Sequence, residues 1–172
     1  MSETRLTHVD ESGAARMVDV SAKAVTARQA TAAGRVLVSA EVVGLLRGTG
    51  VPKGDAVAVA RIAGIAGAKR TPDLVPLCHP IALHGVTVDI EVADDAVEIT
   101  ATARTADRTG VEMEALTAVT VAGLTMIDMV KAVDPRATIT DVRLLRKSGG
   151  KSGDWTRSSP QDSRAADEGQ LR

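Results

Sequence analysis

The chain contains almost no aromatic residues, and this shortage limits the ways in which it can build a core. Phe and Tyr are absent from its 172 residues, Trp155 is the one aromatic residue, and Ala and Val dominate the apolar positions. Small and β-branched side chains bury less area each than aromatic rings do. Further burial through association of identical chains is therefore expected. The sequence predicts one domain that forms a homo-oligomer.

Polar segments flank this domain. Residues 1–15 are mixed and polar, and residues 156–172 are rich in Ser, Asp, Arg and Gln, with almost nothing to bury. Segments of this composition are expected to be disordered. We therefore predict a flexible N-terminal segment at 1–15, a catalytic domain at 16–155 and a disordered tail at 156–172.

Charge and composition argue against several classes of partner. The formal net charge is −1, so the totals give no long-range attraction to nucleic acid or to an anionic membrane surface, and one aromatic residue cannot form a base-stacking platform. No signal peptide is recognised, and no stretch is expected to be long enough to span a bilayer. Cys78 has no second cysteine to pair with, which fits a reducing compartment. We expect a cytoplasmic protein with no nucleic-acid or membrane partner.

The order of the expected elements predicts an α+β fold. The strands are expected from alternating β-prone residues: two strands within 24–39 joined by a turn at Ala33-Gly34, a hairpin of 86–92 and 97–103, and a strand at 139–145. The helices are expected at 40–47, capped by Ser39, at 56–70, stopped by Thr71-Pro72, and at 111–133. The long helix is expected to begin with a capping box formed by Thr109 and Glu112. This order predicts an antiparallel sheet with helices packed on one face.

The segment Pro76–Pro80 holds a Cys-His pair between two prolines, which restrict its backbone. A structural zinc site requires four Cys or His ligands at characteristic spacings. The chain has one Cys and three His, which disfavours such a site. Neighbours on an extended backbone point apart, which disfavours a thiol–imidazole nucleophile. His79 is therefore expected to act as a hydrogen-bonding or proton-transfer group beside Cys78, although a purely structural histidine remains an alternative.

Acidic residues gather at both ends of the long predicted helix. Capping alone could explain Glu112, whereas it does not explain Glu114. Glu114 and Asp128 lie about 21 Å apart along a helix axis, so one small substrate cannot easily touch both in one chain. A site that uses both is expected to lie between subunits. Asp128 and Lys131 share a helix face, either as a surface salt bridge or as a catalytic acid–base pair.

Two Lys-bearing segments stand out, and in the first of them Pro52 and Gly54 hold the backbone while the lysine ammonium is presented. Lys53 stands in the turn Pro52–Asp55, and Lys147–Gly153 is a Gly-rich loop with two lysines, whose N–H and ammonium groups suit phosphate. This loop is not a Walker A motif, because Leu145 stands where that motif requires Gly. A solvated turn lysine and a disordered basic linker are the alternative interpretations.

Taken in order, these segments resemble the MoaC family over about residues 6–155. The similar segments are Met17–Lys23, Lys53–Asp55, Ala60–Ile65, Ala68-Lys69, Pro76–Pro80, Thr109–Leu116, Asp128–Lys131 and Lys147–Gly153. In the family, an aromatic residue often occupies the position of Ile127. This difference bears on side-chain packing near Asp128 and not on Asp128 itself. A non-catalytic relative would be expected to lack Lys53, Asp128 or Lys131, and all three are present. A metal-dependent hydrolase would need a His and carboxylate cluster that three histidines do not suggest.

The resemblance implies a ferredoxin-like fold, a hexamer built as a trimer of dimers, and an active site at the dimer interface. It implies conversion of (8S)-3′,8-cyclo-7,8-dihydro-GTP into cyclic pyranopterin monophosphate with release of diphosphate. It implies no firm cofactor, no metal ligands in the protein, and Mg²⁺ at most as a companion of the triphosphate. By position, the catalytic residues would be Asp128, Lys53 and Lys131. The substrate-binding and orienting residues would be Leu77, Cys78, His79, Met113, Glu114, Glu112, Asp19, Lys23, Lys69 and Lys147.

Overall fold

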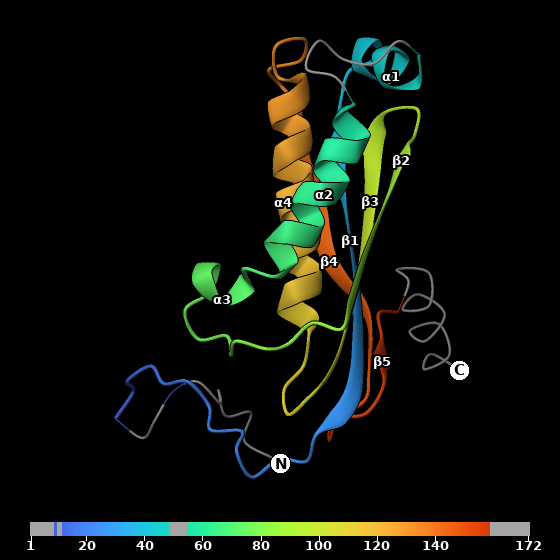
Figure 1. Cartoon of the computed structure of the whole chain (residues 1–172). Helices are drawn as coiled ribbons and strands as arrows, with labels where there is room; N and C mark the ends of the chain where they lie inside the picture. Colours follow the sequence, from blue (N-terminus) through green and yellow to red (C-terminus); the bar gives the residue numbers. More distant parts are fainter. Residues whose placement is uncertain (1–8, 10–11, 49–54, 159–172) are drawn as a thin grey trace, which may run out of the picture.

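The structure, a computed structural model, describes residue 9, residues 12–48 and residues 55–158. Its elements, in chain order, are β1 (Thr26–Leu37), α1 (Ala40–Arg47), α2 (Ala56–Ala68), α3 (Thr71–Leu74), β2 (Gly85–Val92), β3 (Ala96–Asp107), α4 (Glu112–Val130), β4 (Thr138–Ser148) and β5 (Trp155–Thr156). Within the described residues, the strands form one antiparallel sheet in the order β2-β3-β1-β4-β5. Helices α2 and α4 lie on one face of this sheet, and α1 lies at one end (Figure 1). The predicted α+β fold with helices on one face is confirmed.

Strand β1 is continuous, so the predicted turn at Ala33-Gly34 is wrong. β1 pairs with β3 along its whole length, and Gly34 stands opposite Ile99. An added Cβ at Gly34 would lie 2.7 Å from a methyl of Val119 on α4. Gly34 therefore lets α4 approach the sheet, and the irregularity in its sequence corresponds to a β-bulge in the pairing with β4.

Glycines also set the spacing between α2 and α4. A Cβ at Gly64 would lie 2.9 Å from the carbonyl oxygen of Ala118 and 3.1 Å from the Cβ of Ala122. A Cβ at Gly67 would lie 2.8 Å from the side chain of Val121. The two helices thus meet almost backbone to backbone. This close packing gives the core its density without aromatic side chains.

Gly64→Ala is expected to destabilise the fold, whereas Gly44→Ala is expected to stabilise it. Both glycines are helical, and alanine gains up to about 1 kcal/mol of helix propensity at either position. At Gly64 the added methyl meets rigid backbone, and overpacking of this kind costs about 1–3 kcal/mol. At Gly44 on α1 nothing lies within 4 Å of the methyl. Urea denaturation measures both changes, and an equal gain in the two variants would contradict the close approach of α2 and α4.

Side-chain caps fix the starts of α1 and α2. Ser39 Oγ accepts a hydrogen bond from the Val42 backbone N–H at 3.4 Å, as predicted. Asp55 Oδ1 accepts one from the Ala58 backbone N–H at 2.9 Å. Helix α2 ends at Ala68, and the predicted stop at Thr71-Pro72 is in fact the start of the short helix α3. A proline in the first turn of a helix is favourable because it has no N–H to leave unpaired.

The predicted capping box at the start of α4 is wrong. The residue before this helix is Val111, and no side chain caps the helix there. Glu112 instead directs its carboxylate to Lys147 on β4, with Nζ and Oε1 3.1 Å apart. The ion pair with a distant strand replaces the local hydrogen bond that the sequence pattern favoured.

Helix α4 is the core helix of the domain. By length and composition it could cross a membrane, contrary to the expectation that no stretch is long enough, but half of that stretch is buried inside the fold. Ala115, Ala118, Ala122 and Met126 are fully buried against the sheet and α2. Its apolar character is therefore explained by packing within the domain.

Candidate active site

A cleft of about 570 Å³ opens near the N-terminal end of α4. Four segments that are distant in the sequence line it: residues 18–23, residues 77–79, residues 109–114 and residues 147–152. Eight of the predicted substrate-binding residues lie in this lining, namely Lys23, Leu77, Cys78, His79, Glu112, Met113, Glu114 and Lys147. The sheet brings these segments together, because β1 pairs with both β3 and β4 and thereby aligns the ends of all three strands.

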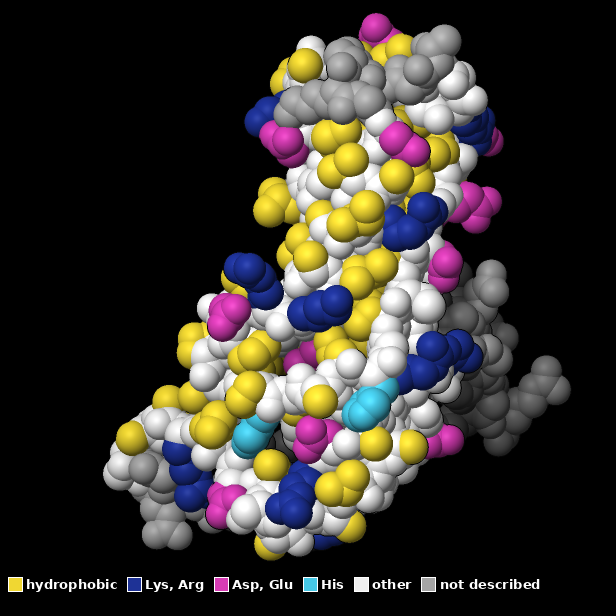
Figure 2. All heavy atoms as spheres, in the orientation of Figure 1, with side chains coloured by type: hydrophobic (Ala, Val, Ile, Leu, Met, Phe, Trp, Pro, Cys, Tyr) yellow, Lys and Arg dark blue, Asp and Glu magenta, His cyan; other side chains and the backbone are white. Residues whose placement is uncertain are grey.

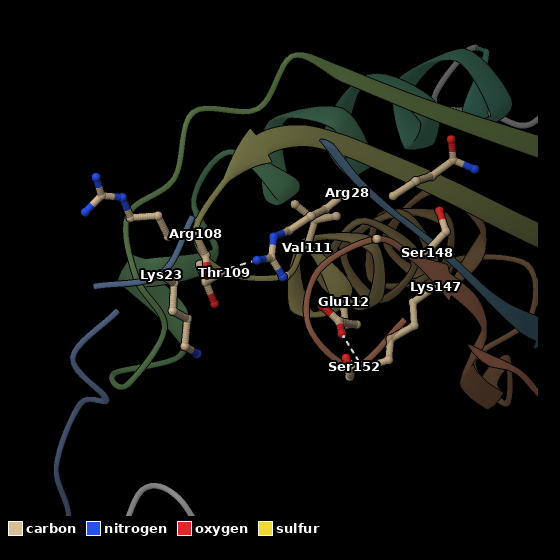
Figure 3. Close-up of a pocket in the computed structure, with 12 residues that line it drawn as sticks. Lys23, Arg28, Arg108, Thr109, Val111, Glu112, Lys147, Ser148 and Ser152 are labelled. Atoms are coloured by element: carbon tan, nitrogen blue, oxygen red, sulfur yellow. Dashed lines mark hydrogen bonds and ion pairs between the residues drawn. The ribbon is translucent and has the colours of Figure 1, made fainter. Parts of the chain in front are cut away.

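A smaller cavity of about 150 Å³ adjoins the cleft and is strongly basic. Lys23 and Lys147 line both cavities, and Arg28 and Arg108 line the smaller one (Figure 3). The Arg108 guanidinium points away from this cavity and donates to the carbonyl oxygen of Ser21, so Lys23, Arg28 and Lys147 supply the positive charge there. Sequence reasoning missed both arginines. Arg108 could have been found from its position just before the Thr109-Gly110 turn, whereas no local signal singles out Arg28 on β1.

The ion pair of Glu112 and Lys147 lies where the two cavities meet. Their side chains are each less than a third exposed, and Lys147 Nζ also donates to Ser152 Oγ at 3.4 Å. A Cβ at Gly110 would lie 1.8 Å from Glu112 Oε2, so glycine makes room for this carboxylate. Glu112 therefore orients the Lys147 ammonium toward the space that both cavities share.

Glu114 places a buried carboxyl group in the wall of the cleft. The residue is 3% exposed. The pKa of Glu114 is raised to about 7: burial is the largest cause, a backbone hydrogen bond lowers the pKa, and the negative charge of Glu112 adds to the rise. The pKa of the Cys78 thiol is also raised, by burial and by the nearby Glu114. A carboxyl group that titrates near neutrality can donate or accept a proton at physiological pH.

His79 and Asp19 join the N-terminal segment to the cleft. His79 Nε2 lies 2.7 Å from the carbonyl oxygen of Val18, so this nitrogen carries a hydrogen and donates it. The pKa of Asp19 is lowered, first by a backbone hydrogen bond from Ser21 at 2.8 Å and also by the nearby His79. Asp19 itself does not line the cleft, but its neighbours Val18 and Val20 do.

Known proteins resemble this chain over nearly its whole length. The model of the MoaC family matches residues 17–150. The chain belongs to the MoaC family. A cyclic pyranopterin monophosphate synthase from Streptomyces coelicolor is 75% identical over 91% of this chain and 92% of its own length. A cyclic pyranopterin monophosphate synthase from Nocardioides is 70% identical over 91% of this chain and 98% of its own length. Cyclic pyranopterin monophosphate synthase 2 from Mycobacterium tuberculosis is 62% identical over 88% of this chain and 91% of its own length.

Two of the three residues predicted to be catalytic in this MoaC-family chain, Asp128 and Lys131, do not line the cleft. Asp128 Oδ1 and Lys131 Nζ form an ion pair of 2.7 Å near the C-terminal end of α4, and both side chains are more than half exposed. Glu114 lies in the first turn of the same helix, about 21 Å along its axis. Lys69 caps the end of α2 and is also outside the cleft lining. Lys53 lies outside the described residues.

The donor groups of the MoaC cleft are suited to anions. Among the described residues, no group of three or more His, Cys, Asp or Glu side chains could hold a metal ion. The cationic side chains of Lys23, Arg28 and Lys147 instead line the small cavity, together with Ser148, Gly149 and Ser152 of the loop after β4. The chemistry of the site is therefore that of a phosphate-bearing ligand next to a buried carboxyl group.

Proposed function

We propose that this MoaC-family chain converts (8S)-3′,8-cyclo-7,8-dihydro-GTP into cyclic pyranopterin monophosphate and releases diphosphate, as a step of molybdenum-cofactor assembly in the cytoplasm. The relatives described above are cyclic pyranopterin monophosphate synthases and share 62% to 75% of their aligned residues with it. The observation that carries the proposal is a basic cavity, lined by Lys23, Arg28 and Lys147, next to a cleft in which the pKa of the Glu114 carboxyl is raised to about 7.

The basic cavity suits the triphosphate. When the cyclic phosphate closes, a hydroxyl of the substrate loses its proton to a base and its oxygen bonds to the α-phosphorus, while the bond from that phosphorus to the diphosphate oxygen breaks. Negative charge then moves onto the departing diphosphate, where Lys23 and Lys147 would stabilise it. Mg²⁺ would accompany the triphosphate, and the protein itself would supply no resident cofactor.

The rearrangement of the ring needs groups that give and take protons. We assign this chemistry to Asp128 as acid or base, with Lys53 and Lys131 as its proton-transfer partners. Leu77 to His79, with Met113 and Glu114, would hold the substrate in the cleft. Glu112 would keep Lys147 directed at the phosphates through their ion pair of 3.1 Å.

A second copy of the chain would complete the site. Large apolar side chains gather on the outer face of α2 and α4 (Figure 2), where Val59, Ile62 and Leu124 are 43%, 68% and 61% exposed. Leu124 lies one turn before Asp128, hence on the same side of α4. A copy that covers Leu124 would therefore also cover the Asp128–Lys131 pair. We propose dimers that share their sites in this way and assemble into a hexamer.

The direct test is turnover of the purified full chain on the cyclic dihydro-GTP intermediate. Wild-type protein should release diphosphate and form a pterin that fluoresces after oxidation. Asp128→Asn should lower turnover by about 10²–10⁴-fold, the usual contribution of a general acid or base. Asp141→Asn is the matched control, since Asp141 is exposed on β4 with a φ of 54° that asparagine tolerates. Binding without release by the wild type would show a non-catalytic binding module instead.

A further inference from the structure

The guanidinium group of Arg28 connects the central strand to the turn that leads into α4. Arg28 Nε donates to the carbonyl oxygen of Asp107 at 2.9 Å, and Nη2 donates to that of Arg108 at 3.1 Å. These carbonyls come directly before Thr109 and Gly110, at the end of β3 (Figure 3). One planar group therefore fixes the start of the segment that carries Glu112 and Glu114.

The other side of the same guanidinium lies against the Gly-rich loop after β4. Gly149 and Gly150 have φ angles of 86° and 74°, which glycine adopts without strain. A Cβ at Gly150 would lie 2.2 Å from Arg28 Nη1, and a Cβ at Gly149 would lie 2.1 Å from the carbonyl oxygen of Ala27. The loop thus rests directly on β1 at Arg28. This loop follows Lys147 and includes Ser152, to which Lys147 Nζ donates.

We propose that Arg28 is a positioning residue for this site: it clamps the 107–111 turn and the 148–153 loop to one strand and so holds Glu112 and Lys147 at their ion-pair distance. The proposal rests on the proposed function for its effect on catalysis, but not for the clamp itself. Two of the guanidinium nitrogens already donate to backbone carbonyls. Arg28 therefore acts mainly through the protein segments that it joins, although it also lines the small cavity.

Lysine cannot replace Arg28 in this role. A lysine ammonium keeps the positive charge, but it is one nitrogen at the end of a flexible side chain. The guanidinium donates to two carbonyl oxygens at once and presents a flat surface to Gly150. A residue that merely attracts phosphate would be largely replaced by lysine. The variant Arg28→Lys thus separates positioning from simple charge.

Hydrogen exchange of the ligand-free full chain tests the clamp without reference to any activity. In Arg28→Lys, amides within 107–111 and 148–153 should exchange about tenfold faster than in the wild type, while amides of α2 should not change. Arg35→Lys is the matched control: Arg35 is also on β1 and binds two groups, Asp95 and Glu98, but it lies toward the other end of the strand. Arg35→Lys should leave both segments unchanged.

Kinetics and binding test the consequence for the site. Arg28→Lys should raise the KM for the cyclic dihydro-GTP intermediate about tenfold and weaken binding of inorganic diphosphate by a similar factor, because Lys147 and Glu112 lose their fixed geometry. Gly150→Ala should reproduce both effects from the loop side, since its methyl would displace the Arg28 guanidinium. This second variant decides the question if Arg28→Lys fails to fold.

Each outcome bears on one of the two proposals. Unchanged exchange in Arg28→Lys and in Gly150→Ala overturns the clamp. Faster exchange with unchanged KM and unchanged diphosphate affinity overturns the positioning role. A wild-type chain without turnover overturns the proposed function, and the exchange rates and diphosphate affinity then still decide whether Arg28 positions the anion site.

Discussion

Mixing Glu114→Gln chains with Asp128→Asn chains is expected to restore about a quarter of wild-type turnover, although each variant alone is nearly inactive. Glu114 is buried in the cleft, whereas Asp128 is exposed at the other end of α4. If each site takes Glu114 from one chain and Asp128 from another, a mixed dimer contains one intact site and one doubly altered site. Half of randomly formed dimers are mixed, which gives about one quarter of the sites.

The mixing experiment requires unfolding and refolding the two chains together, and turnover is then measured by diphosphate release. Mass spectrometry of the intact assembly verifies that mixed oligomers have formed. Asp128→Asn mixed with Asp128→Ala is the control and should recover nothing, because no combination restores Asp128. If the first mixture recovers no activity although mixed oligomers are present, the site is not shared between chains.

Local patterns in the sequence were sufficient to predict the elements whose stability is local. The alternation from Val86 to Val92 predicts the β2–β3 hairpin, and Ser39 predicts the start of α1, because these signals concern adjacent residues. The cleft lining could also be predicted, since its members occur in short dense segments such as residues 77–79 and 112–114. Their assignment came from the family resemblance more than from any one residue.

The predictions that were wrong concern contacts between distant residues. In the sequence Gly34 predicts a turn, but in the fold Val119 of α4 occupies the space that a side chain at position 34 would need. The sequence around Glu112 predicts a helix cap, but in the fold its carboxylate forms an ion pair with Lys147 on β4. Arg28 has no distinguishing neighbours in the sequence, because its carbonyl partners are 79 and 80 residues away. Short-range patterns cannot anticipate such competition, since tertiary partners override local preferences.

The position of the Asp128–Lys131 pair shows a different limit. The i,i+3 spacing predicts contact between the two side chains, and the structure has them 2.7 Å apart. Neither the spacing nor the distance distinguishes a surface salt bridge from a catalytic pair, because both have this geometry. That distinction depends on whether a second chain covers the pair, which is a property of the assembly and not of the single fold.

The free energy of unfolding is expected to fall as pH rises from 5 to 8, and Glu114→Gln is expected to remove most of this fall. Burial raises the pKa of Glu114 from its ordinary value of 4.5 to about 7 in the folded chain. The folded chain therefore binds this proton more tightly than the unfolded chain does. Its contribution to stability is fully present below pH 4.5 and is lost as pH rises through 7. The shift corresponds to roughly 3 kcal/mol at most.

Urea denaturation at pH 5 and pH 8 measures this effect. At pH 5 the wild type and Glu114→Gln should have similar stability, because the carboxyl is protonated and resembles the neutral amide. At pH 8 the variant should be more stable by up to roughly 3 kcal/mol, because the wild type then buries a charge next to Glu112. Glu91→Gln, at an exposed position on β2, is the control and should follow the wild type at both pH values. A constant difference between wild type and Glu114→Gln would mean that Glu114 is ionised throughout, and a carboxyl ionised throughout could not donate a proton in the cleft at neutral pH.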